Sequence, residues 1–141
     1  MSLSTVKKFQ LPTILDARGS LSVFENNRYF PFEIQWVSWF WNHAEIRYDA
    51  DPQYNDFEQV IVLLSGSLLL SVSDGIEEVE LVLDHSSNCI YIPPMILVQL
   101  KYASKDSTAF IASNVPAATE KPSLHFFRNR KASHEQFPLH S

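Results

Sequence analysis

Residues 52–75, PQYNDFEQVIVLLSGSLLLSVSDG, contain the two apolar segments that decide the fold. Residues 57–64 and 67–73 are almost continuously apolar, which is typical of strands buried on both faces. The Ser65–Gly66 step between them predicts a tight turn. Asp74–Gly75 predicts a two-residue type I′ turn after the second segment. The stretch therefore predicts a buried β-hairpin.

Short apolar or alternating runs, separated by turn residues, continue along most of the chain. Strands are predicted at residues 6–11, 21–25, 32–42, 57–64, 67–73, 76–83, 89–92, 96–102 and 107–114. Residues 43–56 are polar and without a period, so we predict a loop there. Short strands at this spacing predict an all-β sandwich or jelly-roll barrel.

The composition becomes polar and basic near the C-terminus. We expect residues 1–118 to form the barrel and residues 119–141 to extend the same domain. Thr119 and Pro122 are suited to the start of a short helix over about residues 121–130.

The strand predicted at residues 32–42 carries bulky aromatic side chains on both faces. Trp36 and Phe40 share one face, and Trp39 and Trp41 share the other. Two interpretations are open. The second face is covered by another subunit, or it is a semi-exposed aromatic face.

Charge and composition exclude several classes of protein. The net charge of −5 argues against a general nucleic-acid binder, which needs clustered Lys and Arg. No apolar run approaches the roughly 18 residues that span a membrane, and no signal peptide is evident at the start. Cys89 is the single cysteine, so no internal disulfide is expected, and we predict that it packs as a small apolar residue. The default expectation is a cytoplasmic, single-domain protein.

An ordered set of motifs resembles one branch of the small cupins. The motifs are Asp16-Ala-Arg-Gly19, Pro31-Phe-Glu-Ile34, Phe57-Glu-Gln59, Leu64-Ser-Gly-Ser67, Asp74-Gly75 and Tyr91-Ile-Pro-Pro94. Their order and spacing resemble the WxcM-like, FdtA-type sugar 3,4-ketoisomerases over roughly residues 6–114. The resemblance implies a cupin-type jelly roll and a homodimer, often with exchanged N-terminal strands. It also implies action on dTDP-4-keto-6-deoxyhexoses, with no metal and no cofactor.

In that family a pair of histidines moves the protons of an enediol-type isomerisation, a role that suits imidazole near neutral pH. Placing the family's Glu-Gln on Glu58-Gln59 puts Pro52 and Tyr54 at the histidine positions. Proline cannot transfer protons, and an unperturbed tyrosine has a pKa of about 10. The metal-cupin pattern, which adds a position at Val98, keeps only Glu58, so no metal site is predicted.

Six residues remain as site candidates. His43, Tyr54 and Glu58 are the candidate substitutes for the catalytic histidines. For ligand binding, Arg18 matches the family's Asp-x-Arg-Gly arginine and suits a pyrophosphate, although a structural turn paired with Asp16 would also explain it. Arg47 and Tyr91 are the other candidates for the pocket.

Three hypotheses for function stay open. The first is a catalytically altered or inactive relative that binds a dTDP-sugar or another small ligand. The second is an active isomerase or epimerase that uses substitute residues. The third is a non-enzymatic partner of a sugar-modifying enzyme. The fold alone does not choose among them.

Overall fold

The computed structural model describes residues 3–25, 31–47, 53–54 and 56–114. A short 3₁₀ helix, η1 (Leu3–Thr5), precedes the strands. One sheet has the spatial order β1 (Lys7–Gln10), β10 (Asn88–Ile92), β7 (Gln59–Ser65), β12 (Thr108–Ser113) and β4 (Trp36–Trp41). The second sheet has the order β5 (Ile46–Arg47), β11 (Leu97–Ala103), β8 (Leu68–Ser73) and β9 (Glu78–Leu83), and β6 (Gln53–Tyr54) also pairs with β11. A separate hairpin consists of β2 (Thr13–Asp16) and β3 (Gly19–Ser22).

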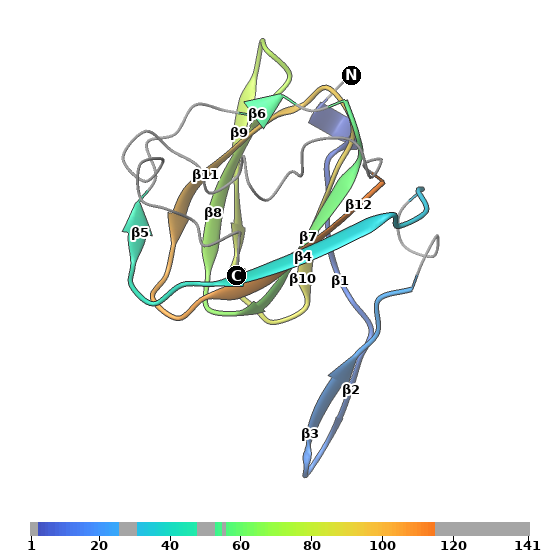
Figure 1. The fold of residues 1–141 in the computed structure, drawn as a ribbon, viewed down its shortest axis with the longest axis vertical. Coiled ribbons are helices and arrows are strands. Elements are labelled where there is room, and N and C mark those ends of the chain that lie inside the picture. Colours follow the sequence, from blue (N-terminus) through green and yellow to red (C-terminus); the bar gives the residue numbers. More distant parts are fainter. Residues whose placement is uncertain (1–2, 26–30, 48–52, 55, 115–141) are drawn as a thin grey trace, which may run out of the picture.

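The two large sheets face each other and enclose an aliphatic core (Figure 1). Because side chains alternate along a strand, β7 contributes Ile61 and Leu63 to this interior and turns Val60 and Val62 to the outer face of its sheet. Burying each such side chain contributes about 1.5–3 kcal/mol. The strand pairs are all antiparallel, so the all-β prediction is confirmed for the described residues.

The two strands predicted at residues 57–64 and 67–73 are present as β7 and β8, but they lie in different sheets and do not pair with each other, so the predicted β-hairpin is wrong. The turn that carries the chain from β7 in the first sheet to β8 in the second depends on Gly66, whose φ of 82° is one that glycine tolerates and other residues rarely adopt. A Cβ at this position would lie 2.6 Å from Ser104 Oγ and 2.7 Å from Ser107 Cα. The chain therefore needs glycine here both for its conformation and for the close approach of the loop that connects β11 to β12.

The turn after β8 differs from the prediction. Ser73 pairs with Glu78, so four residues connect the strands, and the predicted two-residue type I′ turn is wrong. Asp74 Oδ1 instead accepts hydrogen bonds from the backbone N–H groups of Ile76 (2.9 Å) and Glu77 (2.8 Å). These bonds hold the pKa of Asp74 below its usual value. The connection from β8 to β9 is therefore a four-residue turn that the Asp74 side chain stabilises.

Residues 43–56 were predicted to be a loop, but the structure has two short strands in this segment. β5 and β6 pair with different parts of β11 and extend the second sheet. β4 itself covers only residues 36–41 of the predicted 32–42. Of the two interpretations of its aromatic faces, the single chain shows an exposed face, since Val37, Trp39 and Trp41 are 44%, 65% and 57% exposed.

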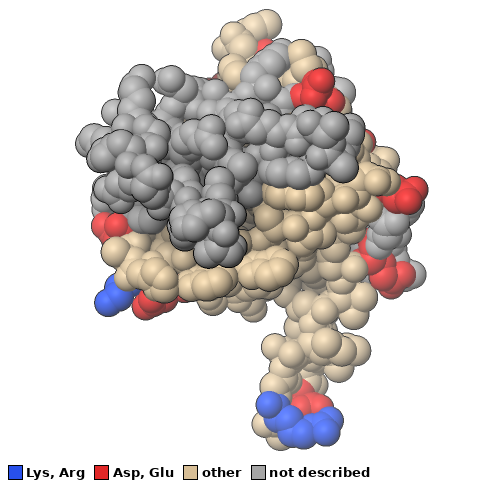
Figure 2. All heavy atoms as spheres, viewed as in Figure 1, with Lys and Arg blue, Asp and Glu red and all other residues tan. Residues whose placement is uncertain are grey.

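The β2–β3 hairpin projects away from the two sheets as an arm (Figures 1 and 2). Every residue of its two strands is exposed. At its base, the N–H of Leu11 donates to the carbonyl of Ser87 (3.0 Å), and the hydroxyls of Ser22 and Ser87 are hydrogen-bonded. The base is thus anchored, whereas the arm itself makes no large contact with the described part of the sandwich.

The helix predicted over about residues 121–130, and with it the 119–141 extension, lies outside the described residues. Within the described ranges, the chain has no helix of the length and apolar character needed to cross a membrane.

Candidate functional site

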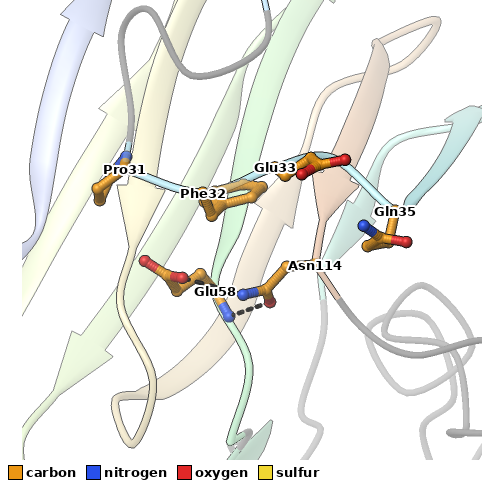
Figure 3. A pocket seen from close by; sticks show the side chains of 6 residues that line it. All are labelled: Pro31, Phe32, Glu33, Gln35, Glu58 and Asn114. Carbon is orange, nitrogen blue, oxygen red and sulfur yellow. Dashed lines mark hydrogen bonds between the residues drawn. The ribbon is translucent and has the colours of Figure 1, made fainter.

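A polar cluster forms where β7 begins and β12 ends. Gln59 and Ser113 are paired, so Glu58 and Asn114 lie opposite each other just beyond the two strands. The backbone N–H of Glu58 donates to Asn114 Oδ1 at 2.8 Å, and Asn114 Nδ2 donates to Glu58 Oε2 at 2.9 Å (Figure 3). These two bonds fix the orientation of both side chains.

Tyr91 completes the cluster from the neighbouring strand β10. Its hydroxyl donates to Glu58 Oε1 at 2.6 Å. The ring is 8% exposed and stacks on Phe32, with centroids 6.2 Å apart. Burial raises the pKa of the Tyr91 phenol, and the hydrogen bond to Glu58 and the charge of its carboxylate raise it further. Tyr91 is therefore a fixed hydrogen-bond donor at neutral pH.

The Glu58–Asn114 pair lines an open pocket of about 530 Å³. The segment before β4 forms the other side, as Figure 3 shows. The lining residues are Pro31, Phe32, Glu33, Gln35, Glu58 and Asn114.

This pocket lies at the outer face of the first sheet and not in the space between the sheets. Tyr91 belongs to the same outer cluster as Leu11, Phe32, Val60 and Cys89. A carboxylate accepts about four hydrogen bonds, so Glu58 keeps acceptor capacity beyond its two side-chain partners. Together with Gln35 and Glu33, it offers acceptors and an amide of the kind that binds hydroxyl groups.

The family model described as "WxcM-like, C-terminal" (FdtA) matches residues 4–120. The chain belongs to the FdtA family. The resemblance predicted from the sequence is thereby confirmed.

Known relatives of this FdtA-family protein are sugar ketoisomerases. TDP-4-oxo-6-deoxy-α-D-glucose-3,4-oxoisomerase of Aneurinibacillus thermoaerophilus is 27% identical over 108 residues, which are 77% of this chain and 78% of the relative. The structure of the WlaRB TDP-quinovose 3,4-ketoisomerase of Campylobacter jejuni has a TM-score of 0.74 and 26% identity over 82% of this chain and 91% of that chain. A mutant of the QdtA 3,4-ketoisomerase of Thermoanaerobacterium thermosaccharolyticum, in complex with TDP-4-keto-6-deoxyglucose, has a TM-score of 0.67 and 19% identity, covers 86% of each chain and shares the fold. The predicted cupin-type fold is confirmed by these structures.

Of the six predicted site residues, the structure of this FdtA-family protein brings together Glu58 and Tyr91. The Glu58 carboxylate lies with Tyr91 at the outer face of the first sheet and not in the core between the sheets. The reason is the alternation along β7, in which Glu58 shares a face with Val60 and not with Ile61.

His43 does not join this pair. It follows β4 and is exposed, beyond the pairing of Trp41 with Thr108, whereas Glu58 lies beyond the pairing of Gln59 with Ser113. These pairings are at opposite ends of β12, so the two residues are about 20 Å apart by strand geometry.

The backbones of Tyr54 and Arg47 belong to the second sheet. Tyr54 in β6 pairs with Leu97, and Arg47 in β5 pairs with Tyr102. Neither strand takes part in the sheet that carries Glu58.

Arg18 lies in the turn between β2 and β3, because Asp16 pairs with Gly19, and its side chain is 91% exposed. It forms an ion pair with Asp16 at 2.7 Å and holds the pKa of that carboxyl below its usual value. The structural turn that was the alternative explanation of Arg18 is therefore present. Within one chain, Arg18 is separated from the Glu58 pocket by the length of the arm.

Five of the six pocket residues were not predicted from the sequence: Pro31, Phe32, Glu33, Gln35 and Asn114. Pro31-Phe-Glu-Ile34 was noticed as a motif, but no pattern indicated that this segment crosses the start of β7. Asn114 could have been identified from its position at the end of a buried strand, because a polar residue there often forms a hydrogen bond with the end of the neighbouring strand.

No group of three or more His, Cys, Asp or Glu side chains within the described ranges is arranged to hold a metal ion. Cys89 is fully buried, and burial raises the pKa of its thiol to about 12. This thiol is suited to packing and not to nucleophilic chemistry.

Proposed function

We propose that this protein binds a nucleotide-sugar of the dTDP-hexose class and does not catalyse the ketoisomerisation of its relatives. The observation that carries the proposal is the family match over residues 4–120. The sequence-based prediction that Pro52 and Tyr54 stand at the positions of the family's histidine pair supports the absence of catalysis. Structural neighbours contain TDP or a TDP-sugar, which supports the class of ligand.

The chemistry of the described pocket supports binding over proton transfer. A 3,4-ketoisomerisation removes a proton from one carbon and delivers one to its neighbour, so it needs groups that both lose and gain protons near neutral pH. The raised pKa of Tyr91 keeps its phenol protonated at neutral pH, so it cannot take up a proton, and His43 is about 20 Å from Glu58. We therefore assign Glu58, Asn114 and Gln35 to holding sugar hydroxyls.

We also propose that the protein is a homodimer. The arm exposes Ile14, Leu15 and Leu21, which are 63%, 75% and 60% exposed. The outer face of β4 adds an apolar hollow of about 370 Å³ lined by Val37, Trp39, Leu64 and Phe110. Exposed apolar surface of this extent on a single chain is typical of an interface, and a second copy would cover both features.

Calorimetric titration with dTDP, dTDP-glucose and dTDP-4-keto-6-deoxyglucose, followed by product analysis, tests the proposal. We expect saturable binding and no 3-keto product. Glu58→Gln should weaken binding of the sugar-bearing ligands about tenfold, because a hydrogen bond to a charged group contributes about 1.5–3 kcal/mol. Glu78→Gln, an exposed carboxylate on β9, is the matched control and should bind as the wild type does.

Turnover above background in the wild-type protein would favour the alternative of an active isomerase or epimerase with substitute residues. The absence of binding by all three ligands would overturn the proposed ligand class.

A further inference from the structure

A second concave surface adjoins the Glu58 pocket on the same outer face. It has a volume of about 810 Å³ and lies between the start of the chain and the end of β10. Its lining residues are Ser4, Thr5, Lys7, Lys8, Phe9, Pro31, Tyr91 and Pro93.

The two hollows meet at two shared features. Pro31 lines both of them. Tyr91 lines the second hollow and donates its hydroxyl to Glu58, which lines the first. The 2.6 Å hydrogen bond therefore lies at the junction, and a ligand that extends past it would touch both surfaces.

The charges at the two ends are opposite. Lys7 and Lys8 lie at one end, and no described acidic side chain forms an ion pair with either ammonium group. Glu33 and Glu58 lie at the other end. Lys7 pairs with Tyr91 across one strand spacing, and Tyr91 pairs with Val60 across the next. The Cα atoms of Lys7 and Glu58 are thus about 12 Å apart by sheet geometry.

We propose that the two hollows form one groove for a phosphorylated sugar, with the phosphate groups beside Lys7 and Lys8 and the sugar beside Glu58. Lysine ammonium groups bind phosphate as point charges. Phe9, Pro31 and Pro93 supply apolar surface between the charged ends, against which a flat ring can lie. This inference rests on the proposed function and names the phosphate subsite that the arm-borne Arg18 does not supply within one chain.

Titration of a Lys7→Gln/Lys8→Gln variant with dTDP and with thymidine tests the phosphate subsite. We expect affinity for dTDP to fall about tenfold, with no change for thymidine, since two partly exposed ion pairs are lost. Because the attraction is electrostatic, the wild-type affinity for dTDP should also decrease with added salt, and the dependence should be weaker in the variant. Lys101→Gln/Lys105→Gln removes the same charge elsewhere and should bind dTDP within about twofold of the wild type.

Failure of the inference and failure of the proposed function give different results. Unchanged dTDP affinity in the Lys7/Lys8 variant, with normal binding of dTDP-glucose, would overturn the groove and leave the proposed function standing. If the wild type binds no nucleotide-sugar, inorganic pyrophosphate is the probe. If the wild type binds pyrophosphate and the Lys7/Lys8 variant does not, the phosphate subsite is supported. If the wild type does not bind pyrophosphate, the phosphate subsite is overturned together with the proposed function.

Discussion

Tyr91 and Glu58 are 33 positions apart in the sequence and are joined by a 2.6 Å hydrogen bond. Their meeting depends on β10 lying beside β7. A single sequence predicts that these strands exist, because their residues are apolar and bounded by turns. It does not predict which strands are neighbours, since several antiparallel orders bury the same side chains. The Glu58 site therefore could not be assembled from the sequence, although both residues were candidates.

Tyr91 should make the stability of the protein depend on pH in the alkaline range. Its pKa is raised in the folded state, so the unfolded chain loses the phenol proton first, from about pH 10 upward, and stability falls as the pH rises further. Below pH 10 the hydrogen bond is fully present. Tyr91→Phe should lower the free energy of unfolding at pH 8 by about 2 kcal/mol and reduce the alkaline decline.

Urea unfolding at pH 8 and pH 10.5 measures this effect. Tyr102→Phe removes a less buried phenol, bonded to Glu45, and should keep the decline. An alkaline decline of equal size in Tyr91→Phe and the wild type would contradict the assignment. Cys89 contributes to the decline in all three proteins, because its pKa is also raised.

Cys89 should be inert to thiol reagents in the folded protein. Its side chain is fully buried and its pKa is raised to about 12, so very little thiolate exists at pH 8. We expect no reaction with a disulfide reagent over hours and stoichiometric reaction after unfolding in urea. Rapid reaction without denaturant would show that β10 is open at this point. The sequence predicted this packing role correctly, because a cysteine within an apolar strand rarely faces solvent.

At the scale of elements, the positions of β7 and β8 were the most predictable part of the fold, whereas their predicted pairing as a hairpin was wrong. The run of apolar residues around Ser65–Gly66 predicts two buried strands, and β7 and β8 lie where they were expected. The apolar pattern does not distinguish a hairpin from two strands that join different sheets, and the structure has the second arrangement. The next turn was not predictable in the same way. Asp74–Gly75 is a frequent two-residue turn, but here the Asp74 side chain caps the N–H groups of Ile76 and Glu77 and stabilises a longer connection.

The two glycine turns should respond differently to alanine. Gly66→Ala places a Cβ 2.6 Å from Ser104 Oγ and 2.7 Å from Ser107 Cα, at a positive φ. We expect a loss of about 3 kcal/mol of stability from overlap and strain together. Gly75→Ala is the matched control, because its φ of 95° is also positive but nothing lies within 4 Å of the added Cβ. It should cost about 1 kcal/mol.

Denaturant unfolding of both glycine variants measures the difference. Equal losses would mean that backbone strain alone governs the Gly66 turn and that the contact with the loop before β12 is dispensable.

At the scale of the whole molecule, the arm and the aromatic face of β4 are exposed in one chain and would be covered in a dimer. Ile14 and Leu21 are paired across the β2–β3 hairpin. Replacing both with serine should convert the proposed dimer to a monomer, because the apolar surface that drives association is lost. Ile76→Ser is the control, since this residue is 92% exposed at a turn remote from the arm.

Light scattering coupled to gel filtration gives the mass of each species. A monomeric wild-type protein at tens of micromolar would contradict the dimer and leave the exposed arm without an explanation. The family resemblance implied a homodimer, but the aromatic strand indicated an interface only as one of two interpretations, because such a face has the same sequence pattern whether a partner or solvent covers it.

One nuclear magnetic resonance sample tests both whether the protein binds a dTDP-sugar and whether it leaves the sugar unisomerised. The sample contains the protein and excess dTDP-4-keto-6-deoxyglucose at neutral pH. We predict saturation transfer from the protein to the sugar and nucleoside protons, together with an unchanged sugar spectrum over several hours. Resonances of a 3-keto product would show that the protein is an active isomerase, and the absence of any saturation transfer would show that it does not bind this sugar.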